Sequence, residues 1–437
     1  MLHRIIWAAR GSYHSILVGL FLILWAGVAG AQSNDNRSPY SRFGYGTLRP
    51  QTMAASRGMG NIGIGLRDGL ITSPANPASY TAVDSLTFLM DVGVSLSGSR
   101  LSDGVLSDMR LLGNLDYLTM LFPLGQRLAM SAGVMPFSST GYSFGSYAPL
   151  MGDTNEQQSQ RIYSGQGHYN VLYLGLGARP LANLSVGVNG GFAFGHATHE
   201  WQIKYANETA FNSIKRERLG LKGFKADFGV QYQLRLDTLG SRSLVLGAVA
   251  SPGIKLQSEY IRSHYRVTKG SSEVVDSDTT KLSGAYTLPL SFAFGVSYRI
   301  KNKLLVGADV RRTLWEQASL PDSKAQLSDQ WLVSAGMEWQ PNYRARSIFA
   351  RSRYRFGLTG ANSYLAVPVG EQYVGYYELG ATGGVGLPLV DRRSMLNLAL
   401  SYKMLMPKIS GMVREQYLEL TLGLTFNEGW FRKARVH

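Results

Sequence analysis

The chain has 437 residues, of which 45% are hydrophobic and 50 are glycine, and it contains no cysteine. The absence of cysteine excludes disulfide bonds, thiol chemistry and a lipid anchor attached to a cysteine. The formal net charge of +15 would fit a nucleic-acid partner. The N-terminus argues against that partner.

The first residues have the pattern of a secretory signal peptide. Arg4 and Arg10 precede an apolar run over residues 16–28, which ends in Ala29-Gly30-Ala31. We predict cleavage after Ala31 and a signal peptide over residues 1–31. The alternative is a membrane anchor, but the run is shorter than the roughly 20 apolar residues of a spanning helix. No later stretch is apolar enough for such a helix, which leaves a soluble secreted protein or a β-barrel.

Residues 32–84 show no strand periodicity and are rich in glycine. Gly58-Met59-Gly60-Asn61-Ile62-Gly63 fits the dinucleotide-binding pattern but lacks the strand before it and the helix after it. The glycines are better explained by close backbone packing. Because the segment is also rich in Met, Ile and Leu, disorder is disfavoured. We predict a plug, or hatch, inside the lumen.

From about Ser85 onward, apolar and polar residues alternate. In residues 290–300 one parity is apolar, from Leu290 to Ile300, and the other holds Ser, Ala, Gly and Arg. Fourteen strands are predicted, beginning near Leu86, Leu115, Leu128, Gly167, Leu184, Gly223, Ser243, Thr287, Lys303, Gln330, Ile348, Gln372, Ser394 and Arg414.

Short and long connections alternate between these strands, as in bacterial outer-membrane barrels. A soluble sandwich would also alternate in hydrophobicity, but it gives no reason for alternating loop lengths. The fold class predicted is therefore all-β: a transmembrane antiparallel barrel of about 14 strands with an N-terminal hatch. The barrel is predicted over residues 85–426, with a periplasmic tail at 427–437 and a location in the outer membrane of a Gram-negative cell.

The order of these features resembles the FadL/TodX-type outer-membrane transporters of long-chain fatty acids and hydrocarbons. Gly58-Met59-Gly60 is followed by Asn76-Pro77-Ala78 and then by the first strand. Members of that family have 14 strands and a hatch with an Asn-Pro-Ala motif. The resemblance implies a hydrophobic ligand near the hatch, with site residues Gly58, Met59, Gly60, Ile62, Asn76, Pro77 and Ala78.

The third strand contains Pro136, Phe137 and Ser138. Proline cannot donate a ladder hydrogen bond and normally lies at an edge or a bulge, although a closed barrel has no edge. The resemblance implies a lateral opening in the wall here. The alternative is a strand that simply starts or ends near Pro136.

Charged residues on the polar parity are expected to face the lumen. Arg353 and Arg355 are candidates to bind the carboxylate of an amphipathic ligand, because arginine forks suit that group. The alternative is a salt-bridged lumen that stiffens the barrel. No catalytic signature is present, so we predict that the chain is not an enzyme, with no cofactor and no metal.

Two functions remain open. The first is passive uptake of hydrophobic or amphipathic, fatty-acid-like molecules through a lateral opening. The second is a scaffold or carrier subunit of an outer-membrane secretion or assembly complex; a simple diffusion pore ranks third because of the plug. Predicted partners are a hydrophobic ligand, outer-membrane lipid or lipopolysaccharide, and the barrel-assembly machinery during biogenesis. Nucleic acid is excluded, and protein partners are left open.

Overall fold

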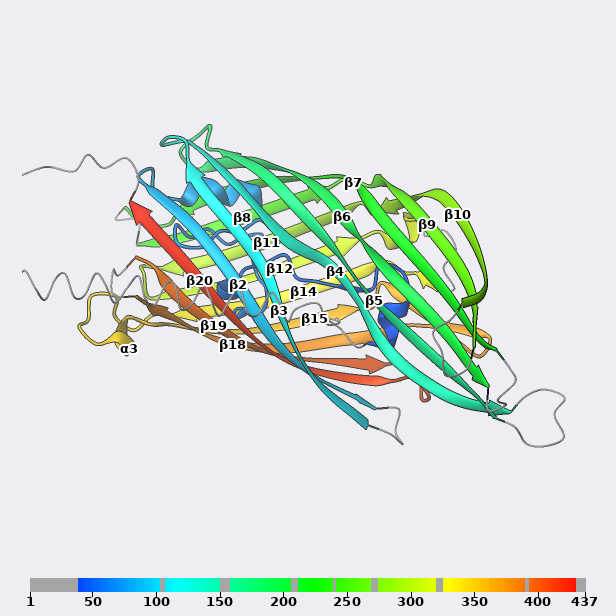
Figure 1. Cartoon of the computed structure of the whole chain (residues 1–437). Coiled ribbons are helices and arrows are strands. Elements are labelled where there is room, and N and C mark those ends of the chain that lie inside the picture. The colour runs from blue at the N-terminus through cyan, green and yellow to red at the C-terminus, as the bar shows by residue number, and fades with distance from the viewer. Residues whose placement is uncertain are drawn as a thin grey trace, which may run out of the picture.

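A computed structural model describes residues 38–102, 107–149, 158–205, 211–238, 241–268, 274–319, 325–389 and 393–429. The predicted signal peptide and residues 430–437 of the predicted tail lie outside these ranges. The strands form one antiparallel sheet that closes into a barrel of 14 spans, because the last strand pairs with the first spanning one (Figure 1). The predicted fold class is confirmed.

Most spans are single strands. They are β2 (Thr87–Ser102), β3 (Ser107–Pro123), β4 (Leu128–Pro149), β5 (Gln158–Ala178), β6 (Leu184–Tyr205), β7 (Asn212–Arg235), β12 (Leu304–Thr313), β14 (Gln330–Trp339), β15 (Arg353–Asn362), β18 (Tyr376–Pro388), β19 (Met395–Pro407) and β20 (Arg414–Gly429).

The other two spans are each interrupted at a proline. β8 (Arg242–Ser251) continues after Pro252 as β9 (Ile254–Val267), and β10 (Val274–Leu288) continues after Pro289 as β11 (Ser291–Ile300). Proline has no N–H for the ladder, which explains an interruption at each position. The β9–β10 hairpin pairs with the outer half of β7 and makes the wall taller on that side (Figure 1).

The two faces of the wall differ in polarity as the alternation predicts. Large apolar side chains are exposed on the outside, including Leu172, Leu174, Phe224, Phe228, Phe294 and Leu358. Polar side chains such as Thr119, Ser131, Gln231, Glu338 and Asn397 are buried inside. An apolar outer belt on a closed barrel is the surface that a lipid bilayer requires. None of the helices in the described ranges is long and apolar enough to cross a membrane.

Several predicted boundaries differ from the structure. The strand expected near Ile348 begins at Arg353, because residues Ile348–Arg351 form a helical turn, α3. Strands running inward from the outer side begin earlier than expected: β3 starts at Ser107 and β7 at Asn212. The barrel runs from Thr87 to Gly429, against the predicted range 85–426.

A small second sheet comprises β13 (Gln326–Leu327), β16 (Leu365–Val369) and β17 (Gln372–Val374). Near it, the short helix η3 (Trp315–Gln317) and Tyr364 contribute to an aromatic cluster. The Trp315 ring lies 4.7 Å from Tyr364 and 5.5 Å from Tyr45, measured between ring centroids. Tyr45 belongs to the N-terminal segment, which therefore packs inside the barrel.

Candidate functional site: the N-terminal segment and the β3–β4 seam

The N-terminal segment, residues 38–86, lies within the barrel (Figure 1). It contains η1 (Pro39–Arg42), β1 (Thr47–Leu48), α2 (Ala54–Arg57) and η2 (Pro77–Ala82). Its apolar side chains are almost fully buried, among them Met53, Met59, Ile62, Ile64, Leu66 and Tyr80. The segment thus forms the core of the barrel in the part of the lumen that it occupies.

The glycine-rich stretch packs directly against glycines of the wall. A side chain on Gly336 would collide with the backbone of Met59, and one on Gly357 with the backbone of Gly60. Gly60 has a φ of +67°, which glycine adopts without strain. Its N–H donates to Thr382 Oγ1 at 2.9 Å. The predicted site residues Gly58, Met59, Gly60 and Ile62 are therefore contact points between the segment and the wall.

Asp309 of β12 holds the next turn of this segment. Its carboxylate accepts hydrogen bonds from the backbone N–H groups of Gly63 at 2.6 Å, Ile64 at 2.8 Å and Gly65 at 3.4 Å. Successive N–H groups that converge on one anion satisfy donors which would otherwise be buried without a partner. No local sequence pattern connects Asp309 with Gly63, Ile64 and Gly65, so this contact was not predicted.

Asn76 is fully buried and fixes the Asn76-Pro77-Ala78 turn. Its side-chain oxygen accepts from the Ala78 N–H at 3.1 Å, which caps η2. Its side-chain nitrogen donates to the carbonyls of Ile64 at 2.8 Å and Val230 at 3.2 Å. One amide therefore joins two parts of the segment to strand β7.

Two ionic networks fasten the segment to the wall. In the first, Arg57 contacts Asp116 of β3 at 2.6 Å and Glu419 of β20 at 3.2 Å. In the second, Asp68 contacts Arg299 at 2.7 Å and Arg353 at 3.1 Å. Burial alone would raise the pKa of the Asp68 carboxyl, but these two guanidinium groups outweigh it and hold the pKa well below its usual range.

Arg353 and Arg355, the predicted carboxylate-binding residues, are both engaged within the chain. Arg353 also contacts Glu338 at 3.2 Å, and Arg355 contacts the same carboxylate at 2.8 Å. Arg355 further donates to Asn397 at 2.7 Å. The structure brings both arginines together in a paired network, and a ligand role for them stays a prediction.

The wall changes near Pro136. In the described part of the two strands, the β3–β4 ladder runs from Pro123 paired with Ala129 to Leu118 paired with Val134 and stops there. Beyond it, β3 stays paired with β2, and β4 stays paired with β5 after a bulge at Phe137. We call the unpaired stretch between residues 107–117 of β3 and 135–149 of β4 the seam. In Figure 1 the outer ends of these strands run apart.

The N-terminal segment covers the β4 edge of the seam from inside. β1 pairs with β4, with Thr47 opposite Ser139 and Leu48 opposite Ser138. The Arg49 N–H donates to the Phe137 carbonyl at 2.9 Å, and the Ser41 hydroxyl bonds to the Gly141 backbone. An unpaired strand edge inside a membrane leaves backbone N–H and C=O groups without hydrogen-bond partners, which is energetically unfavourable. These contacts provide partners for some of those groups.

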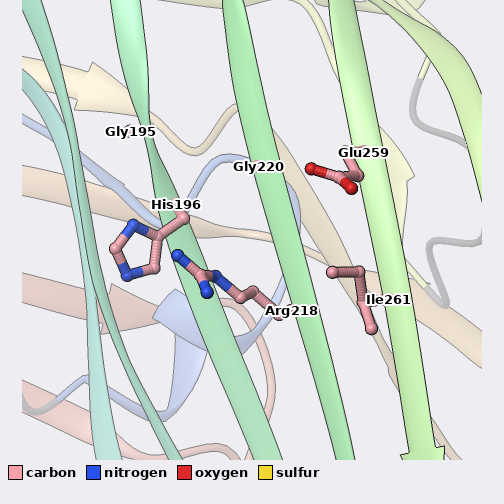
Figure 2. A pocket seen from close by; sticks show the side chains of 6 residues that line it. All are labelled: Gly195, His196, Arg218, Gly220, Glu259 and Ile261. Carbon is pink, nitrogen blue, oxygen red and sulfur yellow. The ribbon is translucent and has the colours of Figure 1, made fainter. Parts of the chain in front are cut away.

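Two cavities lie away from the seam, and both are lined by charged groups. The first, of about 330 Å³, is on the outer face of β6, β7 and β9 between His196, Arg218 and Glu259 (Figure 2). The second, of about 440 Å³, lies at the end of the barrel that carries the short turns. In the described ranges, no group of three or more His, Cys, Asp or Glu side chains is arranged to hold a metal ion.

Comparison with known proteins gives one family and one fold. The family model named BamG matches residues 14–437. No curated protein matches the sequence. Among solved structures, the toluene transporter TodX of Pseudomonas putida is 15% identical, with a TM-score of 0.58 over 88% of this chain and all of that one.

Two further structures show the same fold. A FadL homologue of Pseudomonas aeruginosa is 13% identical, with a TM-score of 0.57 over 87% of this chain and 99% of that one. The monoaromatic hydrocarbon channel CymD is 16% identical, with a TM-score of 0.54 over 89% of this chain and all of that one. The predicted FadL/TodX resemblance is confirmed at the level of fold, as is the outer-membrane location. This chain belongs to the BamG family and has the fold of the FadL/TodX-type outer-membrane barrels.

Proposed function

We propose that this chain is a plugged outer-membrane barrel that serves as a docking subunit of a larger outer-membrane assembly or secretion complex. The observation that carries the proposal is the state of the lumen. The N-terminal segment is fastened to the wall by buried ion pairs and by the Asp309 and Asn76 contacts. Moving it would expose several buried charges at once, which is costly.

The charge-lined cavities support the same proposal. A pocket that holds a hydrophobic ligand is mostly apolar with few polar groups. The cavity on the short-turn side contains five arginines, and the outer-wall cavity contains Arg218, His196 and Glu259. Surfaces of this kind suit charged partners, and the outer-wall cavity is a candidate contact for the predicted lipopolysaccharide.

The test is purification of the full-length, tagged barrel from outer membranes in mild detergent. We expect one or more outer-membrane proteins to co-purify in a fixed ratio, and planar-bilayer recordings to show no steady conductance. A barrel that purifies alone and conducts ions would contradict the docking role.

Passive uptake of hydrophobic molecules with lateral release is the second candidate, and the seam favours it. The β3–β4 ladder ends beside Pro136, and the edge of β4 there is covered from inside by the short strand β1 and by the contacts of Ser41 and Arg49. Phe137 packs between two apolar clusters behind the seam. Withdrawal of β1 would connect that apolar interior to the bilayer. The comparison structures are channels and transporters for such molecules by their own names.

A disulfide lock separates the two candidates, because the chain has no cysteine of its own. Leu48 and Ser138 are direct cross-strand partners, so Leu48→Cys with Ser138→Cys should form a bond on oxidation. Under docking, the locked barrel keeps its partners and supports growth like the wild type. Under lateral release, the lock abolishes uptake of a labelled fatty acid, and reductant restores it. Each single-cysteine variant is the matched control.

A further inference from the structure

The barrel end with the short turns contains an unusual concentration of arginines. The cavity of about 440 Å³ there is lined by Arg67, Arg299, Arg351, Arg353 and Arg393, and Asp68 is the one carboxylate among its lining residues in the described part of the chain. Both ends of the described barrel lie on this side, which is periplasmic in barrels with an even strand count. The cavity therefore opens toward the periplasm.

Among the described residues, the carboxylates near this cavity pair with only some of its arginines. Asp68 is shared by Arg299 and Arg353, and Glu338 behind them is shared by Arg353 and Arg355. Arg67 donates only to neutral acceptors, namely the Ala78 carbonyl, Gln231 and Thr81. Burial, with a contribution from Arg179, lowers the pKa of Arg67 to about 10, as expected for a cation without a carboxylate beside it.

Arg351 supplies a second cation without a carboxylate. It ends the α3 turn, and no ion pair joins it to an acidic side chain in the described part of the chain. Its Nε atom is buried without a hydrogen-bond partner. A buried donor left unpaired costs free energy, which an incoming oxyanion would recover.

We propose that this cavity binds the carboxylates of an acidic peptide segment from a periplasmic partner protein. Arginine forks bind carboxylates in a bidentate manner. The volume far exceeds the roughly 30 Å³ that a water molecule occupies, so one small ion would leave most of it unfilled. Asn302 and Gln340 add amide groups, and Tyr343, Pro388 and Met395 add apolar surface. A peptide can use both the amide groups and the apolar surface, whereas an inorganic anion cannot use the apolar surface.

The inference rests on the proposed docking function for its partner, but the pocket can be tested directly. Fluorescence anisotropy would measure binding of a short glutamate-rich peptide to the full-length barrel in detergent. The same peptide with glutamine in place of glutamate is the neutral probe. We expect the wild type to bind the glutamate peptide at least about tenfold more tightly than the glutamine peptide.

Arg351→Gln should weaken glutamate-peptide binding about tenfold. Arg346→Gln is the matched control, because Arg346 is exposed on the same connection but does not line the cavity. Arg346→Gln should bind the glutamate peptide with an affinity within about twofold of the wild type, because an exposed charge outside the cavity contributes little. Equal losses in the two variants, or equal binding of the two peptides by the wild type, would overturn the proposal.

Competition with inorganic phosphate tests whether the cavity binds a small anion instead of a peptide. Displacement of the peptide by an equal concentration of phosphate would show a small-anion site and overturn the peptide assignment. The outcome for the docking function is separate. If partners co-purify but the peptide does not bind, only this inference fails. If the peptide binds but no partner co-purifies, the docking function fails and the pocket stands.

Discussion

Arg57 Nη1 lies 2.6 Å from Asp116 Oδ2, and this buried pair joins the N-terminal segment to β3 where the seam begins. Asp116 is two residues from Leu118, the last residue of β3 that pairs with β4. The strand that loses its neighbour in the wall is therefore held from inside the lumen. Both side chains are at most 5% exposed, so their attraction is little screened by water.

Replacing Arg57 by Met should destabilise the barrel by about 3–5 kcal/mol, because the buried Asp116 loses its cation. Unfolding in urea, followed by gel mobility of unheated samples, measures the change. Arg49→Met is the control, since its partner Glu419 keeps the contact with Arg57. That control should lose less than about 1 kcal/mol. A similar decrease in the free energy of unfolding in the two variants would show that the Arg57–Asp116 pair stabilises the barrel no more than the contact of Arg49 with Glu419 does.

Gly357→Ala should cost about 1–3 kcal/mol, because its new methyl group collides with the backbone of Gly60. The matched control is Gly360→Ala in the same strand, where the nearest atom is Leu379 Cδ2 at 3.6 Å. Thermal unfolding in detergent compares the two. If both substitutions lower the midpoint equally, the loss reflects strand flexibility and not packing of the N-terminal segment.

The spans could be found from sequence where the wall faces lipid, because only there must every second residue be apolar. Leu172 and Leu174 of β5 and Phe224 of β7 follow this rule, and all are exposed. The outer half of β7 does not, because its outward residues include Arg216, Arg218 and Lys222. Above the lipid an outward charge is no longer costly, so the hydrophobic period ends before the strand does.

The packing of the N-terminal segment could be anticipated only in part. Its glycines and Asn76-Pro77-Ala78 indicated close contact with the wall. Their partners, such as Asp309 for Gly63 and Asp116 for Arg57, lie far away in sequence and share no local pattern with them. The two-residue strand β1 is too short to show any period. These contacts depend on the closed barrel, which brings distant strands to one lumen.

Asp68 should make the free energy of unfolding decrease at acidic pH. Its folded pKa is depressed, whereas an unfolded aspartate titrates near about 3.9. As pH falls from 6 toward 3.5, the unfolded state takes up a proton that the folded state refuses, so stability decreases. The urea midpoint should therefore decrease more between pH 6 and pH 3.5 in the wild type than in Asp68→Asn. An equal fall in both proteins would mean that Asp68 is not held ionised by Arg299 and Arg353.

The backbone of Arg49 offers a test of how β1 covers the seam. Arg49→Pro removes the N–H that donates to the Phe137 carbonyl, whereas Arg49→Ala removes only the side chain and its contact with Glu419. Loss of this backbone hydrogen bond should destabilise the closed edge of β4 by about 1 kcal/mol, which corresponds to a roughly fivefold change in the equilibrium for local opening. Amide exchange by mass spectrometry, over residues 138–142 of β4, should therefore be about fivefold faster in the proline variant than in the alanine variant. Equal exchange in the two variants would show that the hydrogen bond from the Arg49 N–H to the Phe137 carbonyl does not protect the β4 edge.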